Sequence, residues 1–194
     1  MLYNTFIMKK ALTLALSLFC TAALLSSCEQ CGTPVITEPT AADSAWLVYA
    51  KEDSAIFEDK AGNRIKYTAT DSISQTVLGA DVDPGSNCFD KLDTNSIVIL
   101  KDKAKVFPAL ATFIYKTPTK LEVRLAVESS EEKVLTIDSP TYASKVINGV
   151  TYENVYEVTM QKLKDYSAKQ VLFNKEYGFL YIELHNGKTL TRKL

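Results

Sequence analysis

The chain has 194 residues, of which 46% are hydrophobic, and it carries 22 basic and 23 acidic side chains. It is too apolar for a disordered protein, and its length fits one domain that buries a core of its own. Basic and acidic residues are mixed along the sequence. It therefore lacks the clustered basic face of nucleic-acid-binding proteins, and we expect no nucleic-acid partner.

The first 27 residues have the pattern of a secretory signal peptide. Lys9 and Lys10 precede an uncharged apolar run over residues 11–25, and two serines and Cys28 follow. The run is shorter than the about 20 apolar residues that a membrane-spanning helix needs. Met8 stands directly before the lysines and is an alternative start of translation.

The tetrad Leu25-Ser26-Ser27-Cys28 resembles the lipobox of bacterial lipoproteins. The resemblance implies that the Cys28 thiol takes a diacylglycerol, that signal peptidase II cuts before this residue, and that the new amino group is acylated. Several acyl chains give stable membrane attachment, whereas one chain is marginal. We therefore expect a lipid-anchored envelope protein facing the periplasm, at the outer membrane, with surface display left open. An ordinary cleaved signal peptide is the alternative.

Residues 28–42 contain two prolines, three threonines and no hydrophobic period. This composition is typical of an extended tether between an anchor and a folded domain. The predicted organisation is a signal peptide (1–27), a lipidated N-terminus with a flexible tether (28–42) and a single β-rich domain (43–194).

Two thiols remain if Cys20 leaves with the signal peptide and Cys28 is acylated. Cys31 and Cys88 could then form a disulfide, because an exported chain reaches an oxidising compartment. Such a bridge would contribute about 4 kcal/mol of stability and hold the tether against the domain; two separate thiols are the alternative. Cys28 and Cys31 also have the spacing of redox and zinc sites, but an acylated Cys28 supports neither chemistry.

The predicted domain begins with a strand over residues 46–50, and a hairpin with its turn at residues 59–63 follows. Residues 81–87 contain Asp-Pro-Gly and are expected to form a surface loop. The acidic residues of this loop are spaced like the start of an EF-hand. Because the glycine is misplaced and the bidentate glutamate is missing, we expect no calcium site.

A hydrophobic period of two continues through the middle of the chain and indicates β-strands. The clearest alternation lies in residues 120–128, where Leu121, Val123 and Leu125 point to one face. Residues 101–110 and 160–168 could each hold a short helix or an irregular connection. Further strands are predicted at residues 96–100, 112–116, 133–137, 150–160 and 169–173.

Two Asn-Gly pairs, Asn148-Gly149 and Asn186-Gly187, each lie between apolar segments. Asn-Gly accepts the positive φ angles of a type I′ turn, so both pairs predict tight hairpins. Consecutive strands joined by short turns favour antiparallel pairing. The predicted fold class is all-β: an antiparallel meander of hairpins curled into a barrel, half-barrel or sandwich, among which the periodicity does not choose.

The hairpin sequence Asn-Gly-Val-Thr-Tyr-Glu-Asn-Val-Tyr, residues 148–156, and the Tyr-Gly-x-x-Tyr of residues 177–181 have a further resemblance. They resemble the endings of uncharacterised envelope lipoproteins of the Bacteroidota. That group has no established activity, so the resemblance implies no functional residues.

Motifs with a known chemistry are missing from the sequence. It has no nucleophile elbow, phosphate loop or dinucleotide fingerprint, and His185 is the only histidine. We therefore expect no catalytic residue, no cofactor and no metal site, and predict that the protein is not an enzyme.

Three functions stay open at this point. The first is a non-enzymatic domain that binds a protein, glycan or lipid of the envelope through a sheet face or loop rim. The second is a carrier that holds a hydrophobic ligand inside a barrel or half-barrel. The third is a hydrolase whose acidic residues meet only in the folded chain. The many aromatic residues of the chain suit a recognition surface, as the first function requires, and equally suit cross-strand pairs within a sheet.

Overall fold

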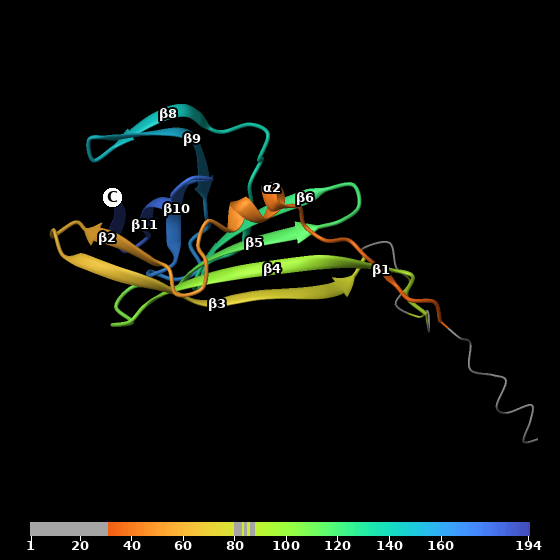
Figure 1. Cartoon of the computed structure of the whole chain (residues 1–194). Helices are drawn as coiled ribbons and strands as arrows, with labels where there is room; N and C mark the ends of the chain where they lie inside the picture. The colour runs from red at the N-terminus through yellow and green to blue at the C-terminus, as the bar shows by residue number, and fades with distance from the viewer. Residues whose placement is uncertain (1–30, 80–82, 84, 86–87) are drawn as a thin grey trace, which may run out of the picture.

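The computed structural model describes residues 31–79, 83, 85 and 88–194, so the predicted signal peptide and Cys28 lie outside the described residues. The described chain is an antiparallel β-structure curled into a half-barrel (Figure 1). Eleven of its strands follow one another in the order β7-β6-β5-β4-β3-β2-β12-β11-β10-β9-β8, and β1 pairs with β4. The all-β prediction is confirmed, and the half-barrel is the correct choice among the three architectures.

The bounds of the first elements are β1 (Val35–Ile36), α2 (Ala41–Ser44), the 3₁₀ helix η1 (Ala45–Leu47), β2 (Ser54–Asp59), β3 (Arg64–Leu78), β4 (Lys91–Asp102) and β5 (Leu110–Lys116). The remaining strands are β6 (Leu121–Val127), β7 (Lys133–Val134), β8 (Tyr142–Ile147), β9 (Val150–Thr159), β10 (Ala168–Asn174), β11 (Gly178–Leu184) and β12 (Thr189–Lys193).

The two Asn-Gly pairs both close hairpins, but through different turns. Asn148 and Gly149 have φ angles of 48° and 80°, as the predicted type I′ turn between β8 and β9 requires. Between β11 and β12 only Gly187 has a positive φ, and the Leu184 amide donates to the Lys188 carbonyl around a three-residue loop. The second turn is therefore longer than predicted, because one residue more separates the paired strands.

The sheet is built from two meanders that meet in its middle. Strands β2 to β7 run outward in one direction and β8 to β12 in the other, and β2 pairs with β12. The outer strands β7 and β8 are joined by only seven residues, 135–141, so the sheet has to curl. Across the gap the Tyr156 hydroxyl donates to the Ile137 carbonyl at 2.7 Å, and the Ala168 amide donates to the Ser130 hydroxyl at 2.7 Å.

The predicted strand at residues 46–50 is wrong. Trp46 lies in the helix η1, buried in the main core, and η1 packs against β5; Figure 1 shows the preceding helix α2. Apolar residues at 46, 47 and 48 do not alternate, which suits a helical turn packed inside the curl better than a strand. We refer to residues 40–50 as the plug.

Three contacts hold the plug in place. Asp43 pairs with Lys116 of β5 at 3.2 Å, and the Lys175 ammonium donates to the Ala42 carbonyl at 2.9 Å. The Tyr49 hydroxyl donates to the Tyr177 carbonyl at 2.8 Å. The N-terminal segment is therefore an integral part of the half-barrel.

The flexible tether predicted over residues 28–42 has to be corrected from Cys31 onward. The structure joins Cys31 to Cys88 in a disulfide and pairs Val35–Ile36 in parallel with β4. Thr40 caps α2: its hydroxyl accepts a hydrogen bond from the Asp43 amide, and the Asp43 carboxylate accepts one from the Thr40 amide. These links join residues far apart in the sequence, so a search for hydrophobic period does not detect them.

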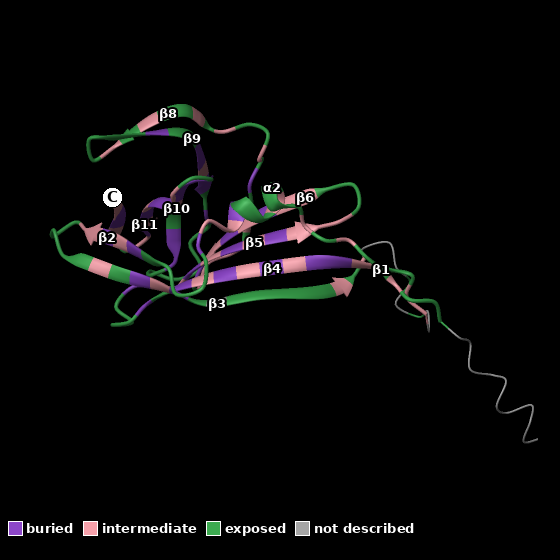
Figure 2. Ribbon diagram, in the orientation of Figure 1, coloured by how far each residue is buried: buried purple, intermediate pink, exposed green. Residues whose placement is uncertain are grey.

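Other boundaries differ from prediction as well. Strand β3 extends to Leu78 through polar residues, because it pairs with β4 from Tyr67 to Leu78. Strand β7 is limited to Lys133–Val134, and residues 103–109 and 160–167 are irregular connections. Figure 2 shows alternating burial along β4 and β5 and an exposed distal half of β3.

Candidate functional site

Strands β3 to β6 present two different faces. In β4, Val98 and Leu100 are buried on the concave side, whereas Ile97 and Ile99 point outward and are half-buried. The same alternation in β5 turns Phe113 outward. The outer face is therefore a partly apolar surface in contact with solvent.

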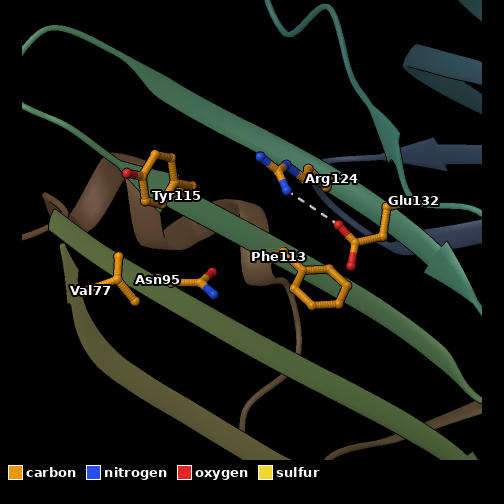
Figure 3. A pocket seen from close by; sticks show the side chains of 6 residues that line it. All are labelled: Val77, Asn95, Phe113, Tyr115, Arg124 and Glu132. Carbon is orange, nitrogen blue, oxygen red and sulfur yellow. Dashed lines mark hydrogen bonds and ion pairs between the residues drawn. The ribbon is translucent and has the colours of Figure 1, made fainter. Parts of the chain in front are cut away.

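A pocket of about 240 Å³ lies on this outer face (Figure 3). We call it the outer-face pocket. It draws one side chain or two from each of the strands β3 to β6 and one from the residue before β7. Its lining residues are Val77, Asn95, Phe113, Tyr115, Arg124 and Glu132.

Strand register brings these residues together. Asn95 is the register partner of Tyr115, and Phe113 is the partner of Arg124. Neighbouring side chains on one face of a sheet lie about 5 Å apart across strands, close enough to act on one ligand. The pocket thus unites residues that are up to 55 positions apart between Val77 and Glu132.

The Tyr115 hydroxyl donates a hydrogen bond to the buried Asp93 carboxylate at 2.8 Å. Loss of solvent around the phenol, and then this hydrogen bond, raise the pKa of Tyr115 to about 12. The phenol therefore stays protonated at physiological pH. Its ring is held in one orientation as a wall of the pocket.

Arg124 lies between two carboxylates. Its Nε donates to Glu122 at 2.5 Å and its Nη1 donates to Glu132 at 3.3 Å. Hydrogen bonds from Lys120 and then Arg124 hold the pKa of Glu122 below its usual range, and the Glu122 contact raises the pKa of Arg124. The guanidinium is therefore fixed and largely neutralised.

The polar side chains of the pocket are hydrogen-bond donors and acceptors. The pocket's lining offers no serine, cysteine or histidine as a nucleophile or base. It does offer a fixed guanidinium, the Asn95 amide, the Glu132 carboxylate and the face of Phe113.

A second hollow, of about 460 Å³, runs along the plug, and we call it the plug groove. The residues that line it include Leu47, Val48, Tyr49, Val98 and Lys175. Val48 has φ 50° and ψ −45°, and the Tyr49 amide donates to the Leu47 carbonyl across it in a γ-turn. Such a turn is strained for a β-branched residue, and strained backbone often marks functional sites.

Arg192 is a half-buried cation on the concave side. Its guanidinium carbon lies 5.7 Å from the centre of the Phe57 ring and 6.0 Å from that of Tyr49. Within the described residues its Nε and Nη1 atoms have no hydrogen-bond partner. Cation–π attraction to the two rings accounts for its position.

The residues singled out from the sequence have different outcomes. Cys28 lies outside the described residues, and its lipidation stays a prediction, whereas Cys31 and Cys88 are paired. His185 lies in the β11–β12 loop, 3.3 Å from the Met160 carbonyl. The described part of the chain places no three His, Cys, Asp or Glu residues where they could hold a metal ion.

The outer-face pocket was missed by sequence reasoning. The alternation in β5 and β6 predicts that Phe113, Tyr115 and Arg124 point away from the core, and that is its only local signal. Val77 and Asn95 had none, because the strand register that brings them near Tyr115 is not encoded locally.

We find no family model that matches the chain, and no curated protein or solved structure that is significantly similar to it. Among the helices of the described residues, none is long and apolar enough to cross a membrane. The function therefore has to be argued from the sites themselves.

Proposed function

We propose that this protein is a lipid-anchored, non-enzymatic binding module of the bacterial cell envelope that recognises a glycan through the outer-face pocket. The lipobox at Cys28 supports the anchor. The observation that carries the binding role is the pocket itself, with Arg124 fixed between carboxylates beside the Phe113 ring.

The chemistry of the pocket favours a neutral sugar. Sugars present hydroxyl groups, which pair with planar donors and acceptors such as those of Asn95, Arg124 and Glu132, and an apolar ring face, which packs on an aromatic ring. An acidic ligand would meet the Glu132 carboxylate and a guanidinium that is already neutralised. A purely apolar ligand would remove water from these polar groups without offering them new hydrogen bonds.

The anchor is tested by mass spectrometry of the protein taken from cells. We expect the mature chain to start at Cys28 and to carry the mass of several acyl chains. A Cys28→Ala variant should be released from the membrane fraction. A native protein with an unmodified Cys28 thiol would overturn the anchor but would leave the pocket proposal standing.

The binding role is tested with the membrane-extracted protein on a panel of neutral and acidic oligosaccharides. We expect binding of neutral members, weakened at least about tenfold, or 1.4 kcal/mol, by Phe113→Ala and by Arg124→Gln. Tyr166→Ala is the matched aromatic control, since Tyr166 is exposed in a loop outside the pocket. Equal losses in all three variants, or no glycan binding at all, would contradict the proposal.

The second candidate is a carrier of a hydrophobic ligand, which the plug groove favours. Trp46 and Tyr49 already occupy the core of the curl, so a ligand would have to lie in the groove, against Leu47 and Val98. Native mass spectrometry of the extracted protein should then show a copurifying lipid that Ala45→Trp, at the groove wall, displaces. Protein without a bound lipid would remove this candidate.

A further inference from the structure

Apolar side chains are exposed at one end of the half-barrel, where β1, β3 and β4 meet. Val35 is 69% exposed, Ile36 42% and Leu78 46%. Leu92 is the register partner of both Ile36 and Leu78, so these three residues form one row across three strands. We refer to Val35, Ile36, Leu78 and Leu92 as the apolar tip.

The N-terminal chain enters the domain at this same end. The Val35 amide donates to the Asp90 carbonyl at 2.9 Å and the Thr37 amide to the Leu92 carbonyl at 2.8 Å. The disulfide between Cys31 and Cys88 adds a covalent link just before β1. Cys31 is therefore held beside the tip and cannot move away from the folded domain.

Only Glu29 and Gln30 separate Cys31 from Cys28. Three extended residues span at most about 10 Å. A lipid anchor at Cys28 would consequently lie within about 10 Å, Cα to Cα, of Cys31, the residue that the disulfide holds beside the tip. The anchor belongs to the proposed function, and the following inference rests on it.

We infer that the apolar tip rests on the lipid bilayer that holds the anchor, and so orients the half-barrel relative to the membrane. Exposed aliphatic side chains that are kept beside a bilayer gain from burial among the headgroups and upper acyl chains. The acyl chains provide the attachment, so the tip needs to contribute orientation only. A protein partner at this end would have to displace the bilayer that the short link keeps there.

Charged neighbours are compatible with this position. Lys91 follows Asp90 at the tip, and Asp83 is close to both in the sequence. The side chains of all three residues are exposed. They can remain hydrated in the headgroup layer, while Val35 and Ile36 reach the apolar boundary. The formal charge of these three residues is −1, so we expect no need for anionic lipid.

Orientation also places the two ends of the molecule. Strand β3 has 15 residues and spans about 50 Å at about 3.3 Å per residue. Its far end, near the loop at residues 59–63, would point away from the membrane. Val77 in the outer-face pocket adjoins Leu78 of the tip, so the pocket would open close to the headgroups.

The test places tryptophan at the tip of the native lipidated protein in phosphatidylcholine vesicles that carry a nitroxide quencher near the headgroups. Trp46 is the only tryptophan of the chain and is buried, so it provides an internal baseline. We expect Ile36→Trp and Leu78→Trp to be quenched at least about twice as strongly as Val146→Trp, because interfacial side chains contact the quencher. Val146 is 65% exposed on the β8–β9 hairpin, away from the tip (Figure 1).

Vesicle flotation separates the two ways of failing. Protein that floats with the vesicles but shows equal quenching at Ile36→Trp, Leu78→Trp and Val146→Trp would overturn the orientation and leave the anchor intact. Protein that carries no acyl chains by mass spectrometry and does not float would overturn the anchor and the orientation with it. Two tip positions, Ile36 and Leu78, are used so that the test can still be read if one of the substitutions disturbs folding.

Discussion

Trp46 packs edge-on against Tyr156, with the ring centroids 5.4 Å apart and the ring planes inclined at 67°. This contact joins the plug at the N-terminus to β9 in the C-terminal half. Edge-to-face pairs of this kind add stability beyond the apolar area that they bury. The plug thus links β5 to β9 inside the half-barrel through packed side chains.

Replacing Trp46 with alanine should therefore lower the free energy of unfolding by about 3–5 kcal/mol, the usual cost of removing a large buried aromatic residue. Urea denaturation followed by circular dichroism measures the change. Tyr166→Ala is the control, with an expected change within about 0.5 kcal/mol, because Tyr166 is 47% exposed. Equal effects of both substitutions would show that the plug is not part of the core.

Gly178 should be intolerant of any side chain. Its φ is 77°, and a Cβ at this position would overlap the Tyr49 phenol. Gly178→Ala should destabilise the protein by about 2–5 kcal/mol, from the left-handed backbone and overpacking together. In Gly187→Ala only the left-handed backbone is strained, since φ is 80° and no atom lies within 4 Å of the new Cβ. This variant should lose about 1–2 kcal/mol of stability. Equal unfolding midpoints for the two variants would contradict the steric argument.

Removal of the disulfide should detach the N-terminal segment. The bridge spans 57 positions, for which the chain-entropy model gives up to about 4 kcal/mol of stability. We expect a Cys31→Ser/Cys88→Ser variant to lose stability in that range. Amide hydrogen exchange at Val35 and Thr37 should become faster, since these amides donate to the carbonyls of Asp90, just before β4, and of Leu92 in β4. Unchanged exchange would mean that β1 holds its place without the bridge.

Alkaline pH should destabilise the protein through Tyr49. Burial raises the pKa of Tyr49 to about 12, above the value of about 10 for an unfolded tyrosine. Stability from the neutral phenol is thus fully present below pH about 10 and is lost as the pH rises to about 12. Tyr49→Phe removes the hydrogen bond to the Tyr177 carbonyl and should cost about 1 kcal/mol at neutral pH.

The same Tyr49→Phe variant should lose less stability than the wild type between neutral and strongly alkaline pH, because one buried phenol no longer ionises on unfolding. Unfolding curves at several pH values measure this difference. A parallel fall of both proteins would assign the alkaline loss to the other buried tyrosines, such as Tyr67, whose pKa burial also raises.

Local sequence determined the elements whose signals lie within a few residues. Asn148 and Gly149 accept positive φ angles, so their hairpin could be predicted without any tertiary contact. Alternation in β6 likewise predicts which side chains, such as Val123 and Arg124, face opposite sides. The resemblance of residues 25–28 to a lipobox is a local pattern as well, and it is the reason for proposing an anchor.

Only the tertiary structure decided how these elements combine. The pairing of Phe57 with Arg192 and the contact of Trp46 with Tyr156 join residues far apart in the sequence, and Val77 and Glu132 line the same pocket. Non-local pairing depends on the sum of many contacts made after the chain has closed long loops, and no single residue signals it. For that reason the sequence predicted strands and one turn type, while the half-barrel, the plug and the outer-face pocket emerged from the folded chain.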